Sequence, residues 1–298
     1  MIRRILPLFA LASIPLLGLA EEQPSPVKPA VQPEPRRIRC GFRTGDRLTG
    51  TNTISYRIET TVRQGQTETK SSESVQRTER FVDVVGRSGE NGVIEIARTY
   101  LKQYTKARTS ETDRPVTFQS PVQGRTVQIE EKRRRREVTM QGQPVDSFVR
   151  RTAGIEIDWR DIFPDEPVAP GDAAWEADSG AIARRLAAYL DCGTHSKMRV
   201  RYEEDTVRDG AKVAKLYIDW TLEGMRDKHL FTKVDLAGEV YYDFALERVV
   251  SVDLAGTMIV RGAIVGDGAP RIVKGEGPVL YKSTLKPSPA DIEASASD

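Results

Sequence analysis

The sequence predicts a mainly β protein in which a curved antiparallel sheet, or an open barrel, wraps one amphipathic helix. Apolar and polar residues alternate through several long segments, which is the two-residue period of a strand with one buried face. The polar second face favours antiparallel pairing, because parallel sheets are normally covered on both sides. One segment, about residues 178–192, instead has the apolar spacing of a helix.

The chain begins with a predicted secretory signal peptide, residues 1–20. Met1–Arg4 is a short positive head, Ile5–Leu19 is almost wholly apolar, and cleavage is expected after Ala20. Once Pro7 and Pro15 are allowed for, the apolar stretch is about half of the ~20 residues that a spanning helix needs, so no transmembrane anchor is expected. The predicted location is therefore outside the cytoplasm, periplasmic or extracellular.

A proline-rich linker is predicted over residues 21–37, because its prolines favour an extended conformation and do not fit a helix or a central strand. A β-rich domain follows over 38–286, and residues 287–298 form a polar tail. The predicted helix divides the domain into two strand-rich runs, about 42–165 and 172–286. These could be two halves of one sheet or two domains, and the lack of a second linker favours one unit.

The charge balance argues against a nucleic-acid partner. The whole chain has 45 Lys and Arg against 43 Asp and Glu, and cleavage would remove Arg3 and Arg4, which leaves equal numbers. A nucleic-acid binder needs a basic excess to displace counterions from phosphates. We therefore expect a well-solvated, neutral mature protein.

Four segments show the strand period most clearly. Turn residues such as Gln64-Gly65-Gln66 and Arg208-Asp209-Gly210 separate the alternating runs. The apolar members, which should face the core, are Ile54, Tyr56, Ile58 and Val62; Leu216, Ile218, Trp220 and Leu222; Val234, Leu236, Val240, Tyr242 and Phe244; and Val252, Leu254, Met258 and Val260.

A four-residue repeat, Asp235–Gly238 and Asp253–Gly256, has the sequence Asp-Leu-Ala-Gly in both copies. It predicts two neighbouring hairpin strands rather than a functional repeat, because there is no third copy.

The helix prediction rests on spacing and on capping residues. Ile182, Leu186, Tyr189 and Leu190 recur at helical intervals, so they should pack on the sheet. Asp178 or Ser179 can cap the start, and Gly193 lies where a C-terminal cap belongs. Arg184 and Arg185 are expected on the other face of the helix.

The two cysteines, Cys40 and Cys192, leave two alternatives open. Outside the cytoplasm they could form a disulfide that closes a long loop, or they could remain two separate thiols. Cys40 lies well beyond the predicted cleavage point, so it is not expected to carry a lipid.

The segment Phe163–Trp175 contains Pro167-Val168, Gly171-Asp172 and Trp175 in an order that resembles uncharacterised secreted bacterial β-proteins, some of them domains of unknown function. In that group a later strand leads from a glycine to an aspartate, and Gly238–Asp243 is similar. The layout also resembles envelope lipid-carrier and lipoprotein folds, in which a curved sheet wraps a helix. The resemblance implies no catalytic residues, and Pro164, Pro167 and Pro170 predict a structural loop anchored by Trp175.

No catalytic, cofactor or metal motif is found. His195 and His229 have no partner at metal-ligand spacing, and no nucleophile elbow, zinc motif or phosphate loop occurs. We therefore expect no cofactor and no catalytic residue, although two carboxylates could still meet in space.

The most marked polar feature is the basic run Lys132, Arg133, Arg134, Arg135 and Arg136, which should project as a hairpin. It could be a solvated ribbon balanced by Glu130, Glu131 and Glu137, or a contact for anionic lipid or another acidic polymer.

Three functions remain. The first is a non-enzymatic binding protein that holds a lipid or other hydrophobic molecule on the apolar face of the sheet, lined by Trp220, Tyr242 and Phe244. The second is a structural module with a filled core that contacts protein, cell wall or another envelope component. The third is a hydrolase with a carboxylate pair.

Overall fold

The computed structural model describes residues 34–89, 92–110, 114–132, 135–153, 159–190, 192–225, 229–265 and 269–288. The described residues belong to one compact unit. The predicted signal peptide, most of the linker and most of the tail lie outside the described residues. No helix among the described residues is long and apolar enough to cross a membrane.

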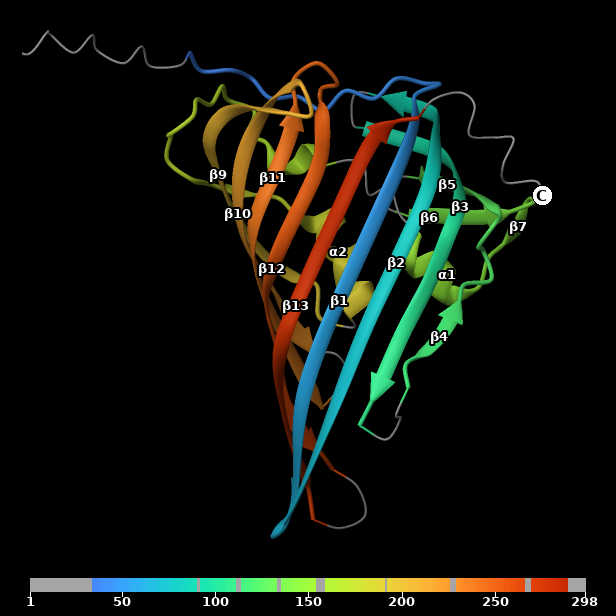
Figure 1. The fold of residues 1–298 in the computed structure, drawn as a ribbon, viewed down its shortest axis with the longest axis vertical. Helices are drawn as coiled ribbons and strands as arrows, with labels where there is room; N and C mark the ends of the chain where they lie inside the picture. The colour runs from blue at the N-terminus through green and yellow to red at the C-terminus, as the bar shows by residue number, and fades with distance from the viewer. Residues whose placement is uncertain are drawn as a thin grey trace, which may run out of the picture. The chain divides into compact units, whose positions relative to one another are not determined.

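One antiparallel sheet of 13 strands makes up the unit (Figure 1). The spatial order is β7-β6-β5-β3-β2-β1-β13-β12-β11-β10-β9-β8, with β4 paired to β3. The strands are β1 (Arg47–Gln64), β2 (Thr67–Gly89), β3 (Gly92–Thr109), β4 (Val116–Gln119), β5 (Thr126–Lys132), β6 (Arg135–Met140), β7 (Gln143–Pro144), β8 (Trp175–Ala177), β9 (His195–Arg208), β10 (Ala211–Met225), β11 (Leu230–Asp243), β12 (Arg248–Ile264) and β13 (Arg271–Pro287).

The sheet curves but does not close, because β7 and β8 end the strand order and have no ladder with each other among the described residues. The first and last long strands, β1 and β13, pair in the middle of the order. This pairing joins the two strand-rich runs into one sheet. The prediction of a curved antiparallel sheet around a helix is confirmed.

Helix α2 (Gly180–Leu190) lies against the concave face, as predicted (Figure 1). Its start is capped by Asp178, whose carboxylate accepts a hydrogen bond from the backbone N–H of Gly180 at 2.8 Å. Leu186 and Leu190 are buried in the core. A second helix, α1 (Ser147–Thr152), and the 3-10 turn η1 (Arg160–Ile162) were not predicted.

Two expectations about α2 are wrong. Arg184 is exposed as expected, but Arg185 is only 7% exposed, because it points into the sheet to meet a carboxylate. Gly193 is not a left-handed cap, since it has no positive φ. A Cβ there would collide with the backbone of Gly224, so close approach of the chain to β10 requires the glycine.

The strand alternation places side chains as predicted. Ile54, Ile58, Leu216, Trp220 and Leu254 are buried on the concave face with most other predicted members of their strands, and Tyr56 and Phe244 are partly buried against the same core. Val62 is the exception, because it is only partly buried and belongs to neither apolar cluster. The Asp-Leu-Ala-Gly repeats lie on neighbouring strands β11 and β12, centred on the pair Ala237 and Ala255. A Cβ at either repeat's glycine would collide with the backbone carbonyl of the other repeat's aspartate, so the glycines allow close strand packing.

The loop before β8 has the structural role that its prolines predict. Gly171 has a φ of +87°, and the Asp172 carboxylate accepts a hydrogen bond from the backbone N–H of Ala169 at 2.7 Å. The Trp175 indole donates to the backbone carbonyl of Ile162 at 2.8 Å. Trp175, the first residue of β8, therefore joins this strand to the η1 turn and closes the loop between them.

The disulfide alternative is wrong: Cys40 and Cys192 are not bonded to each other. Gly41 donates to Glu247 where β11 turns into β12, whereas Gly193 packs on Gly224 near the opposite end of β11. These ends are roughly 30 Å apart at ~3.3 Å per strand residue. A disulfide needs Cα atoms within about 7 Å of each other.

Candidate functional site

The concave face carries two apolar clusters. The first core lies under α2 and spans β1 and β8–β13, with Leu186, Trp220, Leu236 and Leu254 among its members. The second core lies on β2, β3, β5, β6 and α1 and includes Phe81, Tyr100, Ile129 and Val138. Several buried charged groups, among them Glu79, Asp83 and Arg98, lie on β2 and β3.

The polar network centres on Glu79 of β2, which is 1% exposed. Its carboxylate accepts hydrogen bonds from the Gln103 amide and the Tyr189 hydroxyl, each at 2.7 Å, and pairs with the Arg185 guanidinium at 3.3 Å. Arg185 and Tyr189 come from α2, while Glu79 and Gln103 are paired neighbours on β2 and β3. The network therefore fastens the helix to the sheet.

A second buried ion pair lies two rows further along the same strands. The Arg98 guanidinium donates two hydrogen bonds of 2.7 Å to the Asp83 carboxylate, and both side chains are completely buried. The guanidinium also lies over the Phe81 ring, 3.8 Å from its centroid. This bidentate geometry gives each charge the close partner that a buried ion requires.

Burial and the neighbouring positive charge shift the pKa of Glu79 in opposite directions. Burial alone would raise the pKa of Glu79, but the Arg185 charge and the hydrogen bonds from Gln103 and Tyr189 outweigh it, so the pKa is lowered. Burial raises the pKa of Tyr189 well above its ordinary range. At neutral pH the network holds an ionised Glu79 and a protonated Tyr189.

Beside this network lies the concave pocket, a cavity of about 360 Å³. Ile54, Tyr56 and Val75 form an apolar wall from β1 and β2. The opposite side consists of Gln103, Tyr104, Thr105, Phe118, Gln119, Ser120 and Pro121 from β3, β4 and the turn after β4, with Arg77 and Tyr189 completing it. This volume lies within the range of about 300–1,000 Å³ typical of small-molecule sites.

The polar groups of the concave pocket belong to the buried network. Arg77 lies over the Tyr189 ring, 4.6 Å from its centroid, and Gln103 donates to Glu79. Three guanidinium groups, from Arg77, Arg98 and Arg185, therefore accompany two carboxylates, from Glu79 and Asp83, in this part of the face. The pocket combines an apolar interior with a positive wall.

Strand β4 leaves two large apolar side chains exposed on the concave side. Phe118 is 58% exposed and Val116 is 45% exposed, and their ladder partners Thr105 and Ala107 lie on the concave side of β3. Phe118 lines the pocket. An apolar ligand that entered here would cover surface that water now contacts.

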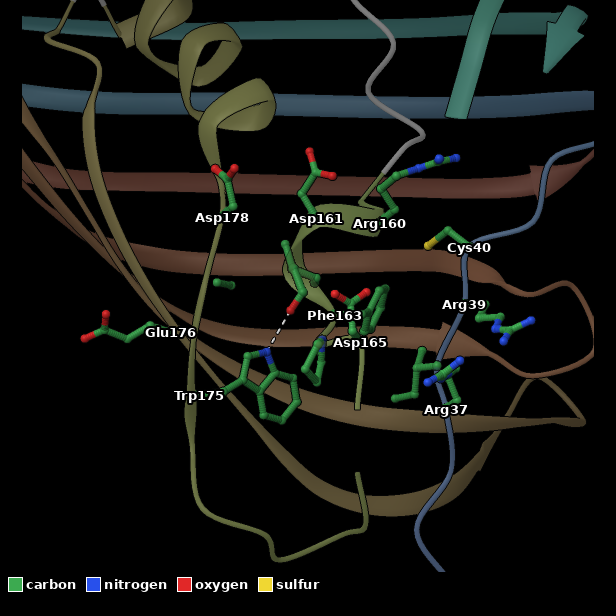
Figure 2. Close-up of a pocket in the computed structure, with 14 residues that line it drawn as sticks. Arg37, Arg39, Cys40, Arg160, Asp161, Phe163, Asp165, Trp175, Glu176 and Asp178 are labelled. Atoms are coloured by element: carbon green, nitrogen blue, oxygen red, sulfur yellow. Dashed lines mark hydrogen bonds between the residues drawn. The ribbon is translucent and has the colours of Figure 1, made fainter. Parts of the chain in front are cut away.

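A second and larger hollow, of about 800 Å³, lies at the β8 edge of the sheet (Figure 2). Residues 37–40, 160–165 and 175–178 line it. Figure 2 shows arginines 37, 39 and 160 around it together with acidic side chains 161, 165, 176 and 178. The mixed charges and mostly polar walls suit an apolar ligand less well than the concave pocket does.

Trp220, Tyr242 and Phe244 lie within the first core and do not line the concave pocket. The Trp220 indole donates to the Ser196 hydroxyl at 2.8 Å. The Tyr242 ring lies edge-on to Phe163 at 5.3 Å and to Phe244 at 5.6 Å. These aromatic side chains pack on the protein's own residues, so the apolar surface under α2 is filled.

The basic run forms part of the β5–β6 hairpin, in which Lys132 pairs with Arg135 and Glu131 pairs with Arg136. This pairing agrees with the expected hairpin. Arg133 and Arg134, and the side chains of the whole run, lie outside the described residues. Its contact with an anionic surface stays a prediction.

The sequence analysis missed the residues of the network and the pocket. One signal was present: Glu79, Phe81, Asp83 and Val85 share one parity on β2, so two charged side chains alternate with two apolar ones on a single face. A charge at an inward position of a strand indicates a buried pair or a site. The partners Arg98, Gln103 and Arg185 could not be assigned without the pairing of β2, β3 and α2.

The histidine and carboxylate groups outside the concave pocket do not form an evident catalytic or metal site among the described residues. His195 is exposed and lies 4.0 Å from Glu223. Among the described residues no cluster of three or more His, Cys, Asp or Glu side chains could hold a metal ion. The buried Glu79 carboxylate pairs with Arg185, which favours its ionised form rather than a protonated general acid, and the buried Asp83 carboxylate is occupied by its ion pair with Arg98.

No family model and no curated protein matches the chain. Among solved structures it is similar to lipovitellin, from a study of lipid–protein interactions, with 8% identity and a TM-score of 0.43. That match covers 85% of this chain and 26% of lipovitellin, so the chain spans about a quarter of that protein's length.

Two further solved structures are similar over most of both chains. An outer membrane lipoprotein-sorting protein domain from Vibrio parahaemolyticus has 11% identity and a TM-score of 0.19, over 83% of this chain and 89% of that one. DynF from the dynemicin biosynthesis pathway of Micromonospora chersina has 10% identity and a TM-score of 0.16, over 85% and 92%. At these scores the likeness does not extend to function.

Proposed function

We propose that this protein is a non-enzymatic binding protein that holds a hydrophobic molecule with an acidic head group in the concave pocket. The observation that carries the proposal is an apolar cavity of about 360 Å³ bordered by Arg77 and the Glu79 network. An apolar pocket with a few convergent polar groups is the usual form of a small-molecule site.

The two sides of the pocket suit the two ends of such a ligand. Ile54, Tyr56 and Val75 offer surface to an acyl chain or a similar apolar body. Arg77 can donate to a carboxylate or phosphate, since its guanidinium is a fixed fork of donors. Arg77 lines the pocket directly, whereas Arg185 is not among the lining residues and pairs with Glu79.

The first test is occlusion of the pocket in the full mature chain. Thr105→Trp should fill the cavity and lower the affinity for lauric acid at least tenfold, measured by displacement of a fluorescent fatty acid. Lys106→Trp is the matched control, because the adjacent side chain lies on the opposite face of β3. Equal affinity of the wild type and Thr105→Trp would contradict the proposal.

The second test concerns the head group. Arg77→Met should weaken lauric acid binding about tenfold, since a hydrogen bond to a charged group contributes about 1.5–3 kcal/mol. Binding of the uncharged dodecanol should change much less. If both ligands weaken to the same extent, Arg77 acts through packing and not through charge.

Native mass spectrometry of protein purified from its own host would detect a resident ligand. We expect a mass excess that disappears on denaturation and is absent from Thr105→Trp. A ligand-free protein that binds no fatty acid would favour the alternative, a structural module that contacts another envelope component. The filled first core is consistent with that alternative over half of the sheet.

We propose that the protein acts outside the cytoplasm, after removal of residues 1–20. The support is the positive head and apolar run at the N-terminus. The intact mass of the secreted protein should correspond to a chain that starts at Glu21. A mature protein that retains Met1 and stays in the cytoplasmic fraction would contradict this.

A further inference from the structure

Exposed apolar side chains gather at one end of the long strands. Large hydrophobic residues more than a third exposed include Met225 at 54%, Ile264 at 41%, Val265 at 69% and Ile272 at 41%. Met225 ends β10, and the other three flank the β12–β13 turn. The opposite end of β9 and β10 has Val207, at 70%.

Basic side chains lie among these apolar ones. Arg261 pairs with Lys274, Ile264 pairs with Arg271, and Arg63 of β1 pairs with Ile272. We call this set the tip surface: the apolar Met225, Ile264, Val265 and Ile272, and the basic Arg63, Arg261, Arg271 and Lys274. Turn residues 226–228 and 266–268 lie outside the described residues.

The described carboxylates nearest this positive charge are Glu68, Glu223 and the cross-strand neighbours Glu59 and Glu276, one row further from the turn than Lys274. Glu59 is itself paired with Arg57 at 3.2 Å. Glu68 lies 3.4 Å from Arg63 and 3.7 Å from Lys70. Glu223 lies 4.0 Å from His195. The basic groups on β12 and β13, Arg261, Arg271 and Lys274, have no ion pair with Glu68 or Glu223. The tip surface therefore presents positive charge together with exposed apolar groups.

The tip surface is held in place by contacts between hairpins. The Arg271 guanidinium donates to the Gln64 side chain at 3.3 Å, and the Gln64 amide donates to the backbone carbonyl of Ala269 at 3.3 Å. Arg261 lies over the Phe231 ring, 5.0 Å from its centroid. In Figure 1 the β1–β2 and β12–β13 hairpins extend well below α2. The basic and apolar groups are thus presented together on ordered strands.

We infer that the tip surface docks on an anionic lipid bilayer. Apolar side chains at hairpin turns can enter the boundary between head groups and acyl chains, while arginine and lysine beside them contact anionic head groups. Charge complementarity selects this occupant over a neutral apolar partner, because the exposed hydrophobic residues alternate with cations. The inference is independent of the concave pocket and of any ligand in it.

The test is co-sedimentation of the full mature chain with vesicles. We expect binding to phosphatidylcholine vesicles that contain phosphatidylglycerol, weaker binding to phosphatidylcholine alone, and weakening with added salt. The variant Arg261→Gln/Arg271→Gln/Lys274→Gln should bind the anionic vesicles about a hundredfold more weakly, at about fivefold for each charge. Val265→Ser/Ile272→Ser should bind them at least tenfold more weakly.

Val207→Ser/Arg208→Gln is the matched control, since it removes one exposed apolar and one basic residue at the other end of the sheet. Its binding should equal that of the wild type. A variant with serine at positions 133–136 tests the basic hairpin separately. Circular dichroism and lauric acid affinity show whether each variant is folded and whether its pocket is intact.

Several results would overturn the inference: no pelleting of the wild type with anionic vesicles, wild-type binding by both tip variants, or an equal loss in the control. Loss of binding only in the 133–136 variant would assign membrane contact to the basic hairpin instead. Recovery of a bound host protein whose contact requires Ile272 and Arg271, without vesicle binding, would make the tip surface a protein interface. Vesicle binding by a wild-type protein that binds no lauric acid would support docking while contradicting the proposed pocket function.

Discussion

The two halves of the concave face differ in the side chains that they bury. Under α2, strands β9–β13 present an almost wholly apolar face, packed by Leu186, Trp220 and Leu254. On β2 and β3 the inward positions include Glu79, Asp83 and Arg98, all buried. The first half is a core whose contacts are complete, whereas the second half contains charges whose positions must be fixed by specific partners.

This difference has a consequence for function. A filled apolar core stabilises the fold without leaving space for a ligand, and Tyr242 and Phe244 illustrate this. The half with the buried network borders a cavity, and its polar groups can orient what enters. The difference also predicts that substitutions in the two halves have separable effects on stability and on binding.

The largest effect is expected from Arg98→Met. Removing the guanidinium leaves the buried Asp83 carboxylate without its bidentate partner, so the free energy of unfolding should fall by about 4 kcal/mol in urea denaturation. The double variant Asp83→Leu/Arg98→Met should recover most of this loss. Arg57→Met, in an exposed ion pair with Glu59, is the control and should change stability by less than ~1 kcal/mol.

Leu254→Ala tests the apolar half. This fully buried side chain should cost about 3 kcal/mol of unfolding free energy, because its removal leaves a cavity in packed surroundings. Lauric acid affinity, measured on the folded variant, should stay within about twofold of wild type. Val207→Ala, at an exposed position, should change stability by less than ~0.5 kcal/mol. A parallel loss of affinity in Leu254→Ala would show that the two halves are not separate.

Tyr189→Phe makes a smaller change in the network. It deletes the hydroxyl that donates to Glu79 and should destabilise the protein by about 2 kcal/mol, as expected for a hydrogen bond to a charged group. Tyr217→Phe is the control, since its ring instead lies beside Arg201, 5.1 Å from the guanidinium carbon. Equal unfolding free energies for the two variants would show that the hydrogen bond to Glu79 contributes nothing measurable.

The smallest expected effect is a change in the free energy of unfolding with pH. The pKa of Glu79 is lowered from its ordinary value of 4.5, because Arg185, Gln103 and Tyr189 outweigh burial. Its stabilisation is therefore complete above the unfolded value and is lost as the pH falls through the folded value. The difference in unfolding free energy between wild type and Glu79→Gln should narrow below pH 4.5. A difference that does not change with pH would contradict this assignment.

Much of the fold could be predicted from local patterns. Leu216, Ile218 and Trp220 show the strand period directly, and Leu186 and Leu190 show the helical one. These patterns are strong because each element buries a single face. Helix α1 and strand β4 were missed, since six and four residues are too few to establish a period.

The candidate site could not be predicted in the same way. Glu79 and Gln103 meet because β2 pairs with β3 in one register, and Arg185 reaches them because α2 crosses the concave face. From sequence, Arg185 belongs beside Arg184 on the solvent side of the helix, and Trp220 belongs to a ligand surface. Both expectations fail because they depend on what faces each residue across the sheet.

The sequence by itself determined the strand periods, the helix, the turns and the one-sided burial that requires a curved antiparallel sheet. These properties depend on backbone geometry and on neighbours within a few residues. Only the tertiary structure decided which inward faces are filled, which buried charges are partners, and where a cavity remains. Those outcomes depend on contacts between residues far apart in the chain, and side-chain alternation is the same whether the opposite surface is α2 or open space.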